Sequence, residues 1–190
     1  MKTNKEIAGM CAEWWAGQII SPKLDSGLTP EGSYIRDQFL SKIQQVTSQK
    51  KEKFIAFLTE KFKEYLDNGA NSYFPICVDY GPEEVLAEAC AFAEIPQENL
   101  PLKTSMSLQL DYVGVMHFGG NSGEGEILYS TKPYWEKAIV ARKKYMRENL
   151  MQLKNSPISE QAVRDADWIA SDCLKAIKAF ETNLIIAEEG

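Results

Sequence analysis

The sequence predicts an α+β fold with N-terminal helices, a small three-stranded β-α-β-β unit and two long C-terminal helices. Three observations support it. Apolar residues recur at helical spacing near both ends, residues 104–110 alternate apolar and polar as a half-buried strand does, and glycine- or proline-rich stretches separate these segments. The order of segments favours an α+β core over residues 1–126. Residues 127–190 are expected to form a helical pair, either packed on that core or projecting as a dimer arm.

The first helix is expected over residues 4–20. Thr3 and Glu6 have the spacing of a capping box, in which a hydroxyl and a carboxylate each bind a free backbone N–H group. Trp14 and Trp15 are adjacent, so they point about 100° apart around the helix. We therefore expect one of them in the core and the other covering a second element, with an exposed aromatic at an interface as the alternative.

Two further helices are expected before the sheet. Residues 29–31 (Thr-Pro-Glu) combine a hydroxyl N-cap, a proline and an acid, which is typical of a helix start. The polar residues 47–51 interrupt the pattern. The next apolar stripe covers residues 54–66, and Asn68-Gly69 ends it as a C-cap does.

The β part is expected to begin at residues 73–80. Residues 81–84 (Gly-Pro-Glu-Glu) start a short helix that residues 95–96 (Ile-Pro) end, because a residue before proline avoids the helical conformation. Residues 104–110 form a strand. Residues 111–118 are either its hairpin partner or its continuation, since no strong turn signal separates the two.

A glycine-rich loop is expected over residues 119–126, followed by two long helices. Residues 131–133 (Thr-Lys-Pro) start the first, which continues to about residue 154, and residues 155–157 (Asn-Ser-Pro) end it. Ser159 and Glu160 start the last helix, which reaches about residue 188. The glycine loop lacks the lysine and the following helix of a phosphate-binding loop, so it predicts a flexible connection.

The residues that usually carry chemistry are sparse. His117 is the only histidine, and it lies in an alternating stretch typical of a packed or half-exposed strand position. The four cysteines are far apart without a CxxC spacing, so we expect small core side chains in a reducing cytosol: Cys11, Cys77, Cys90 and Cys173. Because nucleophile and zinc signatures are also absent, the sequence predicts no catalytic residue, no metal, no cofactor and no enzyme activity.

The segments that lead proteins to membranes are not recognisable either. No stretch of about 18 uncharged apolar residues is present, and the N-terminal residues lack the apolar run of a signal peptide. The sequence therefore predicts a cytoplasmic protein without a membrane partner.

Charge is segregated along the chain. Residues 41–63 have a net charge of +4, whereas residues 64–131 contain eleven acids and only Lys103 as a base. Residues 132–154 have a net charge of +5 and residues 155–190 a net charge of −4. The acidic block suits an electropositive partner, because complementary charge raises association rate and specificity.

The basic helix supports an alternative function. It combines aromatic residues with cations that could hold a phosphate backbone or stacked bases. A solvated face, with the aromatics packed inward, is the structural alternative. The candidate nucleic-acid-binding residues are Lys137, Arg142, Lys143, Lys144 and Arg147.

Several short motifs resemble a known group of proteins. They are residues 14–19 (WWAGQI), 78–83 (VDYGPE), 86–89 (LAEA), 95–96 (IP) and 103–106 (KTSM). Together they resemble a family of small proteins encoded by prophages and mobile elements of gut Firmicutes, among which type II-A anti-CRISPR proteins, inhibitors of Cas9, occur. The resemblance covers about the first two-thirds of the chain and does not extend to the helices after residue 131.

The resemblance implies a partner and a mode of binding. The partner would be a large basic protein in the bacterial host cell, namely a Cas9–guide RNA complex, which holds nucleic acid in positive channels. The alternative is a phage-encoded accessory protein that binds DNA through the basic helix, and a homodimer remains open for either function. The carboxylates that would mimic phosphates are Asp79, Glu83, Glu84, Glu88, Glu124 and Glu126.

Overall fold

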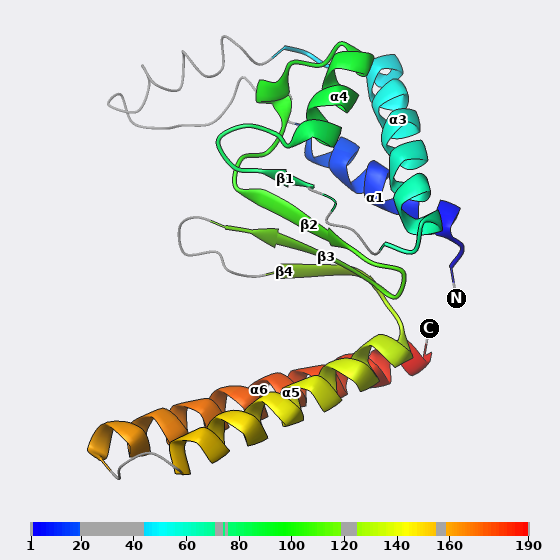
Figure 1. Cartoon of the computed structure of the whole chain (residues 1–190). Helices are drawn as coiled ribbons and strands as arrows, with labels where there is room; N and C mark the ends of the chain where they lie inside the picture. The colour runs from blue at the N-terminus through cyan, green and yellow to red at the C-terminus, as the bar shows by residue number, and fades with distance from the viewer. Residues whose placement is uncertain are drawn as a thin grey trace, which may run out of the picture. The chain divides into compact units, whose positions relative to one another are not determined.

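The computed structural model describes residues 2–19, 44–70, 74, 76–118, 125–154 and 159–189. The chain divides into two compact units, Met1–Tyr129 and Ser130–Gly190 (Figure 1). The first unit combines helices with a sheet, and the second consists of two long helices. The predicted α+β class with two long C-terminal helices is therefore confirmed.

Three helices of the first unit lie on one side of its sheet (Figure 1). They are α1 (Asn4–Gln18), α3 (Ser48–Asp67) and α4 (Glu84–Ala93). A short 3-10 helix, η2 (Gln97–Asn99), follows α4.

The sheet has four strands in the order β1-β2-β3-β4. They are β1 (Cys77–Val78), β2 (Thr104–Leu108), β3 (Tyr112–His117) and β4 (Gly125–Ser130). β2 is antiparallel to both β1 and β3, with Thr104 opposite His117 and Leu108 opposite Val113. Residues 112–117 are therefore the hairpin partner of β2 and not its continuation.

The prediction of three strands was wrong by one, because it omitted β4. This strand has only six residues, and its alternation is weak, since the three apolar residues Ile127, Leu128 and Tyr129 stand side by side. It also follows directly on the glycine-rich stretch. Its place beside β3 depends on tertiary pairing, which a short local pattern does not reveal. The predicted boundary between residues 126 and 127 falls inside this strand.

The helix ends follow local chemistry. The capping box is formed: the Thr3 hydroxyl accepts from the Glu6 N–H group, and the Glu6 carboxylate accepts from the Thr3 N–H group at 2.7 Å. Thr47 caps α3 by accepting from the N–H group of Lys50. α4 ends at Glu94, whose φ of 56° is left-handed and turns the chain toward the proline that follows Ile95.

The core of the first unit lies between the helices and the sheet. Trp15 is fully buried, whereas Trp14 is half-buried and packs against the core, as expected for adjacent tryptophans. Cys11 and Cys90 are buried among apolar side chains as predicted, and Cys77 is half-buried. The largest completely buried apolar side chains are those of Ile7, Trp15, Phe54, Leu58, Phe62, Leu66, Leu86, Leu100, Val78 and Val113.

The second unit is a helical hairpin of α5 (Lys132–Lys154) and α6 (Glu160–Glu189). The helices are antiparallel, since Trp135 packs on Phe180 with 5.5 Å between ring centroids while Arg142 pairs with Asp172. No helix in the described part of the chain is long and apolar enough to cross a lipid bilayer.

Several predicted features lie outside the described residues. They are the helix start at residues 29–31, most of the glycine loop and the break at residues 155–157. Glu124, one of the six candidate acids, also lies there.

Candidate partner-binding site

The turn between β1 and α4 holds three of the candidate acids. We call residues 79–84 the acidic turn. Its backbone closes on itself: the N–H group of Glu83 donates to the carbonyl of Cys77 at 2.9 Å, and that of Asp79 donates to the carbonyl of Gly81 at 3.2 Å. Val78 and Pro82 also form an isolated β-bridge. The turn is therefore held in one conformation by backbone contacts.

Tyr80 lies in the middle of this turn and is 88% exposed, the highest value among the described large apolar residues. The ammonium nitrogen of Lys103 lies 3.7 Å from the centroid of its ring, a cation–π distance. Lys103 also pairs with the carboxylate of Asp79, and this hydrogen bond is the main cause that raises the pKa of the lysine. Lys103 therefore ties Tyr80 and Asp79 to the start of β2.

Glu83 and Glu84 lie at the amino end of α4 and are exposed. Among the described residues, neither carboxylate takes part in a hydrogen bond or an ion pair with a side chain. The N-terminal dipole of a helix favours negative charge at this position. Two carboxylates are therefore available beside the exposed ring of Tyr80.

Glu88, one turn further along α4, is placed differently. Its carboxylate pairs with Lys61 of α3 at 3.8 Å, and Glu94 pairs in the same way with Lys53 at 3.7 Å. All four side chains are exposed, so each pair stabilises the fold by about 1 kcal/mol or less. The basic stretch 41–63 therefore reaches across to the acidic block in space, although the two are separate in sequence.

Glu126 lies in β4, whereas Asp79 follows β1, at the opposite edge of the sheet. Glu126 accepts a hydrogen bond from the indole nitrogen of Trp14 at 3.2 Å. The predicted acids therefore do not form one surface. The structure brings together Asp79, Glu83 and Glu84 and separates them from Glu126.

His117 is half-buried in β3, as its alternating stretch predicted. Its Nδ1 lies 3.0 Å from the hydroxyl of the fully buried Thr104, and its ring lies 6.1 Å from that of Trp14. These contacts join the sheet to α1. They give the histidine a role in packing the first unit.

The cysteines of the first unit are poor nucleophiles. Burial raises the pKa of both Cys11 and Cys90 to about 12. Burial also raises the pKa of Cys77, with a further contribution from Glu83. These thiols are therefore protonated at neutral pH. They are poor nucleophiles, because the thiolate is the reactive form. Across the described residues, no three His, Cys, Asp or Glu side chains lie close enough to hold a metal ion.

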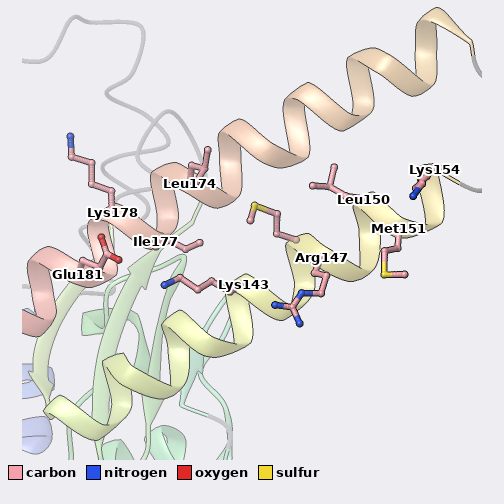
Figure 2. A pocket seen from close by; sticks show the side chains of 10 residues that line it. Lys143, Arg147, Leu150, Met151, Lys154, Leu174, Ile177, Lys178 and Glu181 are labelled. Carbon is pink, nitrogen blue, oxygen red and sulfur yellow. The ribbon is translucent and has the colours of Figure 1, made fainter.

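The second unit contains a groove of about 960 Å³ between its two helices (Figure 2). Its floor is apolar, with Met146 and Leu150 from α5 and Leu174 and Ile177 from α6. Cations flank this floor, mainly from α5. The remaining lining residues are Lys143, Arg147, Met151, Lys154, Lys178 and Glu181.

The candidate nucleic-acid-binding residues fall into different environments on α5. Arg142 is partly buried and pairs with Asp172 of α6, while Lys144 is exposed and pairs with Glu148 at 3.8 Å. Lys143 and Arg147 line the groove. Lys137 is exposed. The five cations are therefore not one continuous basic face, and two of them border apolar surface.

The sequence pointed to the acids of the turn but not to Tyr80 or Lys103. The signal for Tyr80 was present, because a Gly-Pro pair directly after it marks a turn, where side chains are exposed. The role of Lys103 depends on the pairing of β1 with β2, which the sequence does not reveal. The molecule thus combines an α+β unit bearing a preformed acidic turn with a hairpin bearing an apolar groove. Comparisons of the chain with protein families, curated proteins and solved structures found no match.

Proposed function

We propose that this chain is a non-catalytic protein that binds a positively charged macromolecule through its acidic turn. The observation that carries the proposal is Tyr80, an aromatic side chain 88% exposed in a turn closed by backbone contacts. The same turn contains Glu83 and Glu84, which pair with no side chain in the described part of the chain. Tyrosine is among the residues enriched at binding hot spots. A conformation that exists before binding lowers the entropic cost of association.

The charges of the turn support the same function. Glu83 and Glu84 have no cation to neutralise them among the described residues, unlike Glu88 with Lys61. Free carboxylates on an exposed turn attract a basic surface and raise the rate of encounter. The raised pKa values of the buried thiols favour binding over thiol-based catalysis.

We propose the partner that the sequence motifs imply, a Cas9-type nuclease bound to its guide RNA in the cytoplasm of a bacterial host. Such a nuclease reads DNA with arginines in a positive channel. Asp79, Glu83 and Glu84 would occupy the positions of phosphates there, and Tyr80 would pack against the protein. The chain would then inhibit the nuclease by competing with DNA. Residues 78–83 belong to the motifs that carry the resemblance, so motif and exposed turn coincide.

The proposal is tested by measuring binding to a Cas9–guide RNA complex, with and without target DNA. We expect Tyr80→Ala to weaken binding about thirtyfold, the effect of losing the roughly 2 kcal/mol that marks a hot-spot residue. Glu83→Gln with Glu84→Gln should weaken binding several-fold and reduce its dependence on salt. Prior loading of target DNA should block binding.

The matched control is Glu60→Gln with Glu64→Gln. These exposed acids of α3 give the same change in charge away from the turn, so binding should be unchanged. Thermal unfolding of each variant confirms that the fold is intact. Binding that is absent, or that responds equally to both pairs of substitutions, would overturn the proposal.

An electrophoretic shift assay on short DNA duplexes tests the nucleic-acid alternative in parallel. Lys143 and Arg147 are its best-placed residues, since both are exposed on α5 and, unlike Lys144, neither forms an ion pair within the described residues. Salt-sensitive DNA binding that is lost on Lys143→Ala with Arg147→Ala would favour the alternative. Arg142 is unsuitable for this test, because its substitution also removes the pair with Asp172.

A further inference from the structure

The two helices of the hairpin leave several apolar side chains exposed to solvent. Its buried residues, among those described, are Trp135, Cys173 and Ile177. Met151 and Leu174 border the groove and are each 59% exposed. Two helices packed side by side enclose no core between layers, so the apolar face of a hairpin is normally covered by further structure.

The α5 side of the groove is basic. Lys143, Arg147 and Lys154 lie at spacings of four and seven residues, so they follow one side of the helix beside the apolar floor (Figure 2). All three are exposed. Within the described residues, none of them forms an ion pair.

The α6 side of the groove carries less positive charge, because α6 contributes one cation, Lys178, and one acid, Glu181, to the lining. Leu174 and Glu181 line the groove seven residues apart, and Asp167 lies a further seven residues before Leu174. Side chains at this spacing follow one side of a helix that packs against another. Asp167 and Glu181 are exposed, and Lys178 is the one cation that α6 contributes to the lining. The α5 side of the groove is therefore more basic than the α6 side.

We propose that a second copy of this chain covers the groove, with α5 of each copy against α6 of the other in a two-fold symmetric four-helix bundle. A surface formed by one basic and one acidic helix is complementary to itself under a two-fold rotation. The cations of α5 then meet the acids of the other α6, and the two apolar floors face each other. The reverse pairing, α5 on α5, would place the cations together.

The whole helices support the same arrangement. α5 contains seven basic and two acidic residues, whereas α6 contains three basic and seven acidic residues. Each basic helix would therefore have an acidic helix on both sides, one from its own chain and one from the second copy. α5 has 23 residues, which corresponds to a length of about 35 Å, ample for a stable bundle. The dimer would carry two acidic turns, one from each copy. The inference therefore adds a second binding site to the function proposed for a single chain.

Sedimentation velocity of the full chain over a range of concentrations tests the proposal. We expect a reversible monomer–dimer equilibrium that weakens as salt is raised, since exposed charges are screened. A chain that stays monomeric up to about 100 μM, a weak affinity for a specific interface, would overturn the proposal.

Charge reversal then tests the pairing of the helices. Lys143→Glu with Arg147→Glu makes α5 acidic, and Asp167→Lys with Glu181→Lys makes α6 basic. Each double variant alone should raise the dimer dissociation constant about tenfold or more. Mixed together, the two variants should form a heterodimer, because both of its interfaces then join opposite charges.

A control matched to the α5 variant uses Lys144→Glu with Lys175→Glu, exposed cations that do not line the groove and whose reversal changes the net charge as Lys143→Glu with Arg147→Glu does. It should leave the dimer intact. Leu174→Asp should dissociate the dimer without loss of helix, because this side chain is already exposed in one copy, and circular dichroism checks the helix content. A dimer that survives Leu174→Asp, or double variants that fail to join in the mixture, would overturn the arrangement. Substitutions in the acidic turn should not change the dimer, so the two proposals fail separately.

Discussion

The two units of this chain bury their apolar residues in different ways. The first places three helices on one side of a four-stranded sheet, and its core includes residues from every layer, such as Trp15, Phe54 and Val113. The second has only two helices, and three of its described residues are buried. The units thus differ in whether their own layers enclose a core. The first unit therefore buries far more apolar surface than the second.

Ion pairs join helices in both units. In the first unit, the lysines of α3 meet the glutamates of α4 in exposed pairs such as Lys61 with Glu88. In the second unit, Arg142 and Asp172 join the helices in a partly buried pair. The exposures of these side chains are similar in the two units, so each pair contributes about 1 kcal/mol or less. The units therefore differ in apolar burial and not in the strength of their ion pairs.

The largest expected effect is on stability, and it is seen by comparing one apolar substitution in each unit. Phe54→Ala removes a completely buried ring from α3 and should lower the free energy of unfolding by about 3–5 kcal/mol. Val163→Ala removes an exposed side chain from α6 and should change the free energy of unfolding by less than about 0.5 kcal/mol. Urea unfolding followed by circular dichroism measures both. Equal losses would mean that Val163 is packed as closely as Phe54 and that α6 is covered at this position.

A smaller effect is expected when two buried cysteines are compared. Cys11 of the first unit and Cys173 of the second are both fully buried, so each reacts only after local opening. We expect Cys173 to be alkylated about tenfold faster than Cys11, which corresponds to about 1.4 kcal/mol less opening free energy for the hairpin. Mass spectrometry of peptides after timed alkylation gives both rates.

The same alkylation rates can be measured at several protein concentrations. If two hairpins associate, alkylation of Cys173 should slow as the chain is concentrated, because binding stabilises the closed state. Alkylation of Cys11 should not change, which makes it the internal control. Similar rates for the two thiols at every concentration would contradict the difference in stability between the units.

Features that depend on neighbouring residues could be predicted from the sequence. The capping box of Thr3 with Glu6, the start of α4 after Pro82 and its end before Pro96 all follow from side chains within one turn of the helix end. Trp15 is fully buried and Trp14 half-buried, as expected for two adjacent positions that point about 100° apart on a helix. These contacts are local, so no knowledge of the fold was needed to place them.

Features that depend on residues far apart in the sequence could not be predicted from local patterns. β4 is a strand because it pairs with β3, and its own six residues carry little signal. The charge of residues 64–131 looked uniform in sequence, yet Lys61 and Lys53 of α3 lie against the glutamates of α4. The separation of Glu126 from the acidic turn likewise follows from the order of strands. The candidate site is therefore limited to Asp79, Glu83 and Glu84, which lie close together in sequence.

The smallest expected effect compares one cap in each unit. The Thr3 hydroxyl caps α1, and the Ser159 hydroxyl caps α6 by accepting from the N–H group of Ala162 at 3.1 Å. Thr3→Ala and Ser159→Ala should each lower the free energy of unfolding by about 1 kcal/mol at pH 7. Only the first cap has a reciprocal carboxylate, since Glu6 accepts from both the backbone and the side chain of Thr3.

This difference between the caps predicts different pH dependence. Hydrogen bonds from Thr3, first that of its backbone N–H group, lower the pKa of Glu6 below its ordinary value of 4.5. A lowered pKa in the folded state stabilises the fold above the ordinary value, and this stabilisation is lost as the pH falls through the folded-state pKa. The loss caused by Thr3→Ala should therefore shrink below about pH 4.5, whereas the loss caused by Ser159→Ala should not. Urea unfolding of both variants and the parent chain at neutral and acidic pH measures the two differences, and parallel pH dependence would show that the hydrogen bond from the Thr3 hydroxyl to Glu6 does not stabilise the cap.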